Sequence, residues 1–559
     1  MPFLPEHPRF KGISLPPSGW VLALLLAAYI FIGLIGHDPW KHDDAISIGI
    51  AYDIFSNGDW LTPELAGQAH PHAPFYYWTA ALATHFFSWL LPVHDAARLA
   101  SGLYTLLALE FILLAARELH GREHAAAAPL ILAGSIGFLF HAHEAQPMLA
   151  ALTAHTAAYW ALTLLPRRPR LATIVFGAAL ALGFLANGLL PVLTLLPLTI
   201  CALWQSANRK TSALLLLAAL ILSLALCAAW LLPLQLAAPD YLASFLHGEL
   251  ASLAKPVAIL PNIGRYLNLL LWYAWPALPL AAWALWAKRR ALASKPLALP
   301  IATFVAVLLI LGARIEVSSA VTLLLLPPLV LLAEPGVASL RRGAANAFDW
   351  FGMMTFTLFA VVVWIAWSAM VFGWPERLAR QVVRLEPGFV GQFDPIAFVF
   401  ALLVTIVWFW LIVTSPRSPM RGIMHWMAGL TLFWLLIATL WMPWIDYGKT
   451  YRPLSASLAE TLPARGNCVA NSNLSDSILA SLDYFNGIRT VEHGSAAGKS
   501  CDWLLAQGEP PSETAAGWHK VWEGRRPSDR RDSEKLVLYR RDGGSAAPAK
   551  KLKNGAARR

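Results

Sequence analysis

The stretch SALLLLAALILSLALCAAWLLPLQL, residues 212–236, contains no charged side chain. A helix needs about 20 apolar residues to cross a bilayer, where backbone amides must bond to one another because lipid offers them no partner. Comparable runs recur between Trp20 and Trp444, and of the 559 residues 57% are hydrophobic and only 14% charged, with a mean hydropathy of +0.54. This composition excludes a soluble globular enzyme and predicts an all-α polytopic membrane protein.

Fourteen apolar runs are candidates for membrane spans. If all of them crossed, the basic linkers 167–170 and 288–290 would lie opposite the basic N-terminus, against the positive-inside rule. The run 75–92, FYYWTAALATHFFSWLLP, is short, rich in interfacial aromatic residues and interrupted by His85. We therefore expect this run to lie along the membrane surface. About thirteen transmembrane helices then remain, with juxtamembrane helices in the first external loop.

Seven basic segments, including the N-terminus, fall on one side of this arrangement, which we expect to be cytoplasmic. The net charge of +10 is interpreted as a signal of orientation, and no nucleic acid partner is implied. Residues 37–96 and everything after 446 then face outward. The chain is predicted to be a multi-pass protein of the bacterial inner (plasma) membrane, with a cytoplasmic N-terminus and a periplasmic C-terminal domain.

Three parts of the chain differ in composition: a transmembrane domain at 1–445, a small periplasmic α/β domain at 446–542, and a disordered basic tail at 543–559. Within the α/β domain, strand-like pieces are expected at 467–471, 501–507 and 535–541, with a helical piece at 475–482. The Arg-rich stretch 521–541 has two interpretations. It binds anionic lipid headgroups or the acceptor, or its charges are simply solvated on the surface of a small domain.

Two of the four cysteines, Cys468 and Cys501, lie in this polar domain, 33 residues apart. They are either a disulfide or two buried free thiols. An outward-facing position favours the disulfide, because such bonds persist in oxidising compartments.

Residues 37–74, HDPWKHDDAISIGIAYDIFSNGDWLTPELAGQAHPHAP, are more polar and patterned than a connector requires. Asp43 and Asp44 open a predicted helix that ends at Asn57, with Gly58 as a left-handed C-terminal cap. Asp43 has two interpretations. It is either an N-cap that accepts backbone N–H bonds, or a functional carboxylate at the membrane surface.

The first external loop resembles that of the GT-C superfamily of lipid-linked-sugar glycosyltransferases, and more narrowly those of bacterial aminoarabinose (lipid A) transferases and protein O-mannosyltransferases. The matching strings are the acidic pair, GDWLTP at 58–63 and YYW at 76–78. Further likeness lies in AARLASGLY at 96–104, LGFLANGLLPVLTLLP at 182–197 and LLPPLVLLA at 325–333. The resemblance implies thirteen spans and an inverting transfer of sugar from a polyprenyl-phosphate donor to a lipid A-like or other envelope acceptor on the periplasmic face.

The resemblance also implies catalytic carboxylates and a phosphate site. The catalytic candidates are Asp43, Asp44 and Glu144, the last being the nearest carboxylate to the family's second acidic position. The chain departs from the family where His72 and Asn187 stand in place of lysines that are expected to hold the phosphate of the lipid carrier. Substrate-binding candidates are therefore Lys41, His72, Tyr76, Tyr77, Asn187, Arg265 and Arg314.

The sequence establishes no cofactor, but a divalent metal is considered. Two His-x-His pairs could join Asp43 and Glu144 as ligands, namely His70 with His72 and His141 with His143. The pattern is weak, because it places both rings on one side only in an extended strand. Besides the donor, the acceptor and membrane lipids, no partner is implied, and a monomer is expected.

Two other classes of protein stay open. A transporter or flippase of polyprenyl-linked intermediates would show internal repeats and charges at mid-span, whereas the ionisable residues here collect outside the apolar runs. The replacement of the two family lysines favours a protein that binds such lipids without catalysing a transfer.

Overall fold

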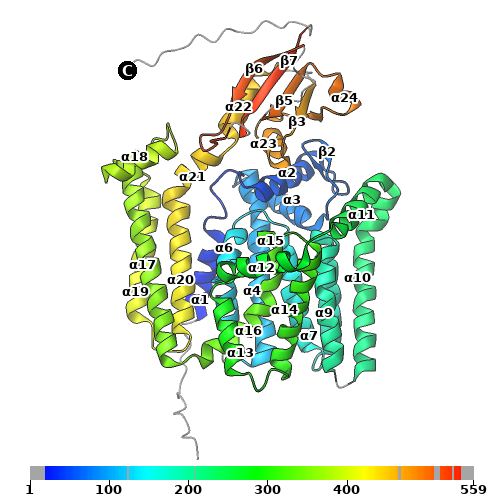
Figure 1. Ribbon diagram of the computed structural model, residues 1–559, viewed down its shortest axis with the longest axis vertical. Helices are drawn as coiled ribbons and strands as arrows, with labels where there is room; N and C mark the ends of the chain where they lie inside the picture. Colours follow the sequence, from blue (N-terminus) through cyan, green and yellow to red (C-terminus); the bar gives the residue numbers. More distant parts are fainter. Residues whose placement is uncertain are drawn as a thin grey trace, which may run out of the picture.

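The computed structural model describes residues 19–122, 125–206, 208–463, 468–508, 517–531 and 534–542. The basic residues of the N-terminus and the predicted tail at 543–559 lie outside this described part. Figure 1 shows a bundle of upright helices, with the first external loop and the C-terminal sheet stacked on one end. We call that end the loop end and the other the far end.

Eight helical segments in the described ranges are long and apolar enough to cross a membrane, or nine if one bent pair is included. The eight are α4 (Val93–His120), α8 (Pro169–Asn187), α10 (Arg209–Ala237), α14 (Lys295–Arg314), the α15 to α16 segment (Ser319–Ser339), α17 (Arg342–Phe372), α19 (Pro395–Thr414) and the α20 to α22 segment (Arg421–Thr461). The other helices before residue 421 are α1 (Gly19–Phe31), α2 (His42–Asn57), α3 (Phe75–Phe87), α5 (Ala127–Ala133), α6 (Ile136–Ala142), α7 (Met148–Leu164), α9 (Leu189–Gln205), α11 (Pro239–Ala254), α12 (Ile259–Tyr273), α13 (Ala277–Ala287) and α18 (Glu376–Leu385). The chain is a multi-span helical membrane protein.

The structure does not confirm the expected count of thirteen spans, and two of the expected apolar runs are broken. The run 125–141 forms two short helices, α5 and α6. The apolar run 264–287 is not one straight helix: α12 and α13 meet at an angle of 102°. Pro276 lies in the break, directly before α13, and proline lacks the N–H that a continuous helix would use there. By contrast, the run 75–92 forms α3, only 13 residues long and packed against α2 and α4, so the expectation that it does not span is confirmed.

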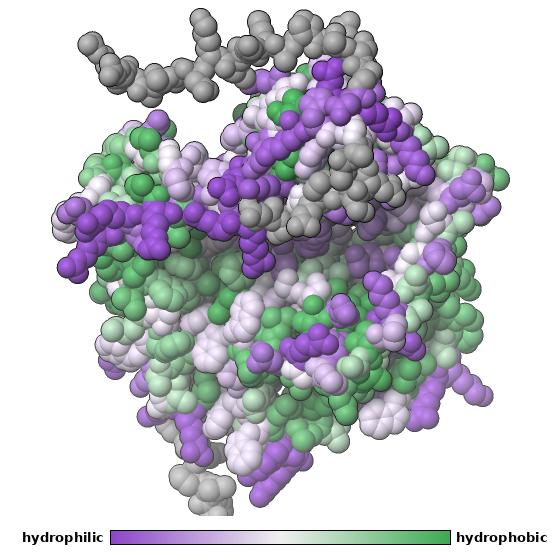
Figure 2. Space-filling view, turned by 45° about the horizontal axis from the view of Figure 1, so that its top comes forward, coloured by the Kyte–Doolittle hydropathy of each residue, from purple (hydrophilic) through white to green (hydrophobic). Residues whose placement is uncertain are grey.

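The bundle presents apolar side chains outward. The hydrophobic windows of α10, α17 and α19 are only 22%, 28% and 17% buried, whereas that of the α15 to α16 segment is 94% buried. Figure 2 shows the resulting apolar surface below the polar loop end. Such faces are stable only against lipid, which makes the first three helices the outer, lipid-facing ones.

The C-terminal segment forms a mixed five-stranded sheet in the order β4-β3-β5-β7-β6. Its strands are β3 (Val469–Ser472), β4 (Val491–Glu492), β5 (Trp503–Gln507), β6 (Trp518–Gly524) and β7 (Leu536–Arg541). Helices α22 (Arg452–Thr461), α23 (Asp476–Asn486) and α24 (Ala496–Lys499) accompany it. The three expected strands and the expected helix are confirmed. The short β4 and the edge strand β6 were not expected, and a register shift between Lys520 and Trp522 interrupts the alternation of β6.

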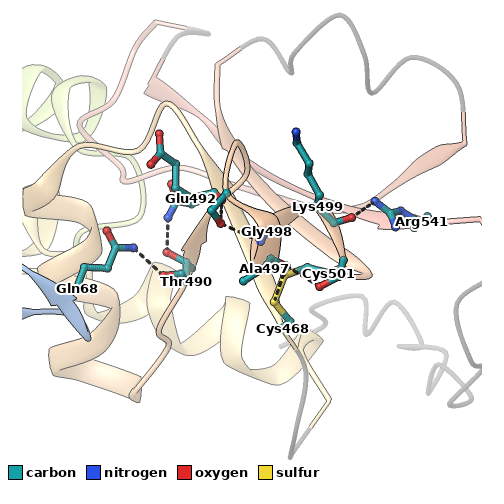
Figure 3. Close-up of a disulfide and its surroundings, with 12 residues drawn as sticks. Gln68, Cys468, Thr490, Glu492, Ala497, Gly498, Lys499, Cys501 and Arg541 are labelled. Atoms are coloured by element: carbon teal, nitrogen blue, oxygen red, sulfur yellow. Dashed lines mark hydrogen bonds between the residues drawn. A yellow bond between two sulfur atoms is a disulfide. The ribbon is translucent and has the colours of Figure 1, made fainter.

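Cys468 and Cys501 form a disulfide, the first of the two alternatives (Figure 3). The same view shows how the first external loop reaches this domain. The Gln68 side chain, from the hairpin of β1 (Glu64–Leu65) and β2 (Gln68–Ala69), donates a hydrogen bond of 2.8 Å to the carbonyl of Thr490.

We predict that replacing both of these cysteines by serine loosens the sheet. Closing a loop of 33 residues stabilises a domain by roughly 3 to 4 kcal/mol through the entropy of the unfolded chain. Hydrogen exchange of the full-length protein should therefore show protection of β3 and β5 falling by about 10² to 10³-fold. Unchanged protection would contradict the prediction, and exchange in α4 serves as the internal control.

The loop end is packed tightly against the C-terminal domain. A Cβ atom at Gly49 of α2 would lie 2.9 Å from the Cβ of Ala480 in α23, so only glycine permits this approach. Nearby, the Asp38 carboxylate accepts hydrogen bonds from the Arg452 guanidinium and, at 2.7 Å, from the hydroxyl of Thr450. The first external loop is thus tied to the C-terminal domain by packing and by charge.

We predict that acid loosens this contact. Burial raises the pKa of Asp38, but the donors Arg452 and Thr450 outweigh it and hold the pKa below its ordinary value. A depressed pKa means that the stabilisation is present above the unfolded value, about 3.9, and is lost as pH falls through the folded value. The hydrogen-exchange protection factors of the α22 amides, which correct for the intrinsic exchange rate at each pH, should fall below about pH 4, and the Asp38→Asn variant should show low protection there that does not change with pH.

Candidate active site

The first turn of helix α2 carries two neighbouring carboxylates of the site, Asp43 and Asp44, which differ in exposure. The N-cap of α2 is Lys41, and no side chain caps the helix, so the interpretation of Asp43 as an N-cap is wrong. The helix starts one residue earlier than expected, which places Asp43 inside the first turn, exposed, while Asp44 is fully buried. At the other end Gly58 adopts φ 74°, the left-handed cap expected from the sequence.

Asp44 is held in a buried ion pair. Its Oδ1 accepts from Arg98 Nε at 3.0 Å and from the backbone N–H of Ala145 at 2.7 Å, and its Oδ2 accepts from Arg98 Nη2 at 2.8 Å. Both side chains are 0% exposed. Burial raises the pKa of Asp44, but the Arg98 guanidinium lowers it further, leaving the carboxyl below its ordinary value. Asp44 therefore positions α2 and the loop at 143–147, and it is out of reach of a substrate.

Glu144 has a similar environment nearer the surface. Its carboxylate contacts the His141 ring on one side and the Lys41 ammonium, 3.1 Å away, on the other. Burial raises the pKa of Glu144, but Lys41 and His141 outweigh this, so the carboxyl stays ionised near pH 7. Lys41 also donates to the carbonyl of Phe140 at 3.3 Å, which leaves one of its three N–H groups for a ligand.

Asp43 is the exposed carboxylate of this group. Its Oδ2 accepts a hydrogen bond of 2.9 Å from the Gln146 side chain, which fixes the carboxylate while leaving its other oxygen free of any partner in the described chain. Tyr77 lies buried close by, and burial first, with the charges of Tyr241 and Asp43, raises the pKa of its phenol. The phenol therefore stays neutral and can donate a hydrogen bond.

Tyr76 is part of the scaffold and does not face a ligand. It is fully buried, its hydroxyl lies 2.7 Å from that of Ser101, and it accepts from the backbone N–H of Gln146 at 3.0 Å. Ser101 in turn donates to the carbonyl of Glu144 at 2.7 Å. These bonds fix the loop that carries both Glu144 and Gln146.

The four histidines do not assemble a metal site. His70 and His72 stack on each other with ring centroids 4.1 Å apart, whereas the His143 ring nitrogens lie 2.9 and 2.5 Å from the carbonyls of Leu139 and Tyr29. Within the residues that the structure describes, no group of three or more His, Cys, Asp or Glu side chains could hold a metal ion. Desolvation and the neighbouring His70 lower the pKa of His72 to about 4, so this ring offers no positive charge to a phosphate near pH 7.

The remaining candidates lie around the loop end. Asn187 is half-buried at the junction of α8 and α9, where Glu249 of α11 accepts the Leu189 N–H at 2.7 Å. Arg265 of α12 and Arg314 of α14 are exposed on two helices that are joined through Asn262, which donates to the carbonyls of α14 and its C-cap. Helix α6 connects this pair to Lys41, because Phe140 binds Lys41 and His141 packs on Tyr273 of α12.

Two residues that hold the site were missed from the sequence. Arg98 bonds Asp44 and, at 3.1 Å, Asp95, while Gln146 orients Asp43. A signal for Arg98 was present: a charged residue inside an apolar helix is costly unless it is paired, and so it points to a specific role. Gln146 had no such signal, because its partner is 103 positions away.

No family model and no curated protein sequence matches the chain. Solved structures do. ArnT from Cupriavidus metallidurans bound to undecaprenyl phosphate aligns with a TM-score of 0.70 at 17% identity, over 95% of this chain and 100% of that one. The same ArnT in the apo state aligns with a TM-score of 0.63, also at 17% identity, over 93% and 98%. The chain thus shares its fold with this ArnT.

Proposed function

We propose that the chain is an integral-membrane, inverting glycosyltransferase that moves a sugar from a polyprenyl-phosphate donor to a lipid A-like or other envelope acceptor. One observation carries this proposal. Asp43 is an exposed carboxylate held by Gln146 beside the buried Asp44 to Arg98 pair, in a fold shared with a protein that binds undecaprenyl phosphate. Glycosyl transfer needs a carboxylate that is held in position to act on the acceptor or on the activated sugar.

In this reaction an acceptor oxygen attacks the anomeric carbon of the donor. The bond from that carbon to the phosphate oxygen breaks, and polyprenyl phosphate leaves with the electron pair. Asp43 takes the proton of a hydroxyl acceptor, or, where the acceptor is itself a phosphate, orients it and stabilises positive charge on the sugar.

Positive charge for the departing phosphate comes from Lys41, Arg265 and Arg314 in place of the two family lysines. Lys41 keeps one free N–H, and both arginines are exposed at the same end of the bundle. Glu144 acts through Lys41, whose ammonium it positions.

We also propose the thirteen-span arrangement, in which shorter apolar helices such as α7 and α9 cross together with the longer ones. The loop end then faces the periplasm and the far end the cytoplasm. The disulfide at the loop end supports this orientation, because a stable disulfide is typical of an oxidising compartment.

The test uses the purified full-length protein with radiolabelled polyprenyl-phosphate sugars and a panel of lipid A-like and other envelope acceptors. Label that passes to an acceptor, with release of polyprenyl phosphate, supports the enzyme. A donor lipid that the protein protects but does not consume would identify a non-catalytic lipid-binding protein. Movement of the intact donor lipid across the proteoliposome membrane, without transfer of its sugar, would identify a flippase.

A further inference from the structure

The far end of the bundle contains a pocket of about 640 Å³, well separated from the candidate active site. It is formed where α4, α13 and α16 end and α14 begins. Its polar lining consists of His120, Lys288, Ser294, Glu334 and Ser339, and the rest is apolar. Figure 1 shows these helix ends on the side away from the C-terminal sheet.

Glu334 is the unusual group in this pocket. The residue is 1% exposed, and its Oε1 accepts no hydrogen bond from any residue that the structure describes. Its Oε2 lies 3.8 Å from the Nδ1 of His120, too far for a hydrogen bond. A carboxylate buried at the end of an apolar helix is costly unless a donor reaches it, which points to a ligand that supplies one.

His120 contributes an acceptor and not a donor. Its Nε2 lies 2.9 Å from the carbonyl of Leu331, and since a carbonyl only accepts, Nε2 carries the proton. In the neutral ring Nδ1 is then a lone pair that faces Glu334. Three acceptor atoms therefore converge with no donor between them, an arrangement that suits the three N–H groups of a primary ammonium.

A cation stands at the rim of the same pocket. Lys288 is exposed, has no ion-pair partner in the described ranges, and its charge acts on both Glu334 and His120. An ammonium of this kind binds phosphate as a point charge. Acceptors for an amine and a cation for a phosphate therefore share one cavity with apolar walls, at the ends of helices long and apolar enough to cross a membrane.

We propose that this pocket binds a phosphate-linked primary amine, the chemistry of an ethanolamine phospholipid headgroup. The ammonium lies between Glu334 and His120, the phosphate lies at Lys288, and the acyl chains remain in the bilayer. Free O-phosphoethanolamine has the same chemistry and is the alternative source. The site is independent of the proposed transferase reaction, which takes place at the loop end.

The test is native mass spectrometry of the full-length protein with equimolar phosphatidylethanolamine, its N-methyl and N,N-dimethyl forms, and phosphatidylcholine, all with the same acyl chains. We expect about tenfold or greater retention of the ethanolamine lipid over the choline lipid, declining as N–H donors are removed. Equal retention of the four lipids would overturn the proposal, and this comparison needs no variant to fold.

Variants then locate the site. Glu334→Gln should abolish the preference, and Lys288→Gln should weaken retention of all four lipids. Glu118→Gln is the matched control, because this carboxylate lies at the same end of α4 but pairs with Arg167 outside the pocket. A preference that survives Glu334→Gln would contradict the assignment. Displacement of the lipid by equimolar O-phosphoethanolamine would identify the free amine as the ligand, and no displacement at hundredfold excess would identify the lipid.

Discussion

The Asp43→Asn variant is expected to lose transfer activity by about 10² to 10⁴-fold, the contribution typical of a positioned general base. The amide keeps the size of the carboxylate and can still bond to Gln146 through its oxygen, so the local structure should persist. Asparagine cannot take a proton, however, nor stabilise positive charge on the sugar. The loss should appear in kcat, with little change in KM for the donor.

The measurement is the initial rate of label transfer from a polyprenyl-phosphate sugar, alongside the Tm of the purified protein. Glu64→Gln is the matched control, since this carboxylate lies in the same loop, in the β1 hairpin and away from Asp43. Full activity of Asp43→Asn would remove the catalytic assignment. Loss in both variants would instead indicate that the loop tolerates no change of charge.

The predictable parts of the fold depend on neighbours in sequence. The period of α2 and its Gly58 cap, the surface helix α3 and the strands around the two cysteines are all encoded within a few residues. The break between α12 and α13 is also local, because Pro276 lies in it, but the apolar run 264–287 was expected to form one span.

The sequence could predict which types of residue form the site, but not how these residues pair or which of them are buried. Which carboxylate is buried and which is exposed depends on Arg98, whose partner Asp44 lies 54 positions away, and a single sequence does not reveal that pairing. The two His-x-His pairs failed as a metal site for the same reason. Their surroundings, such as the carbonyls that face His143, come from distant segments.

Arg98→Met is expected to cost about 3 to 5 kcal/mol of stability, because it leaves the carboxylate of Asp44 buried without a counter-ion. Asp44→Leu should be similarly harmful, since it leaves the guanidinium of Arg98 in the same place with one remaining carboxylate, Asp95. Each single variant should show a large fall in Tm or in the yield of folded protein in detergent.

The double variant Asp44→Leu, Arg98→Met distinguishes a buried charge from simple loss of packing. Removing both ions takes away the desolvation penalty, so the double variant should be more stable than either single variant, whereas two cavities would add their costs. Its transfer rate should nevertheless stay low, because Asp44 also binds the backbone N–H of Ala145, one residue before Gln146. A double variant less stable than both single ones would show that the pair is not the source of the loss. A stable and fully active one would show that the pair does not position Asp43.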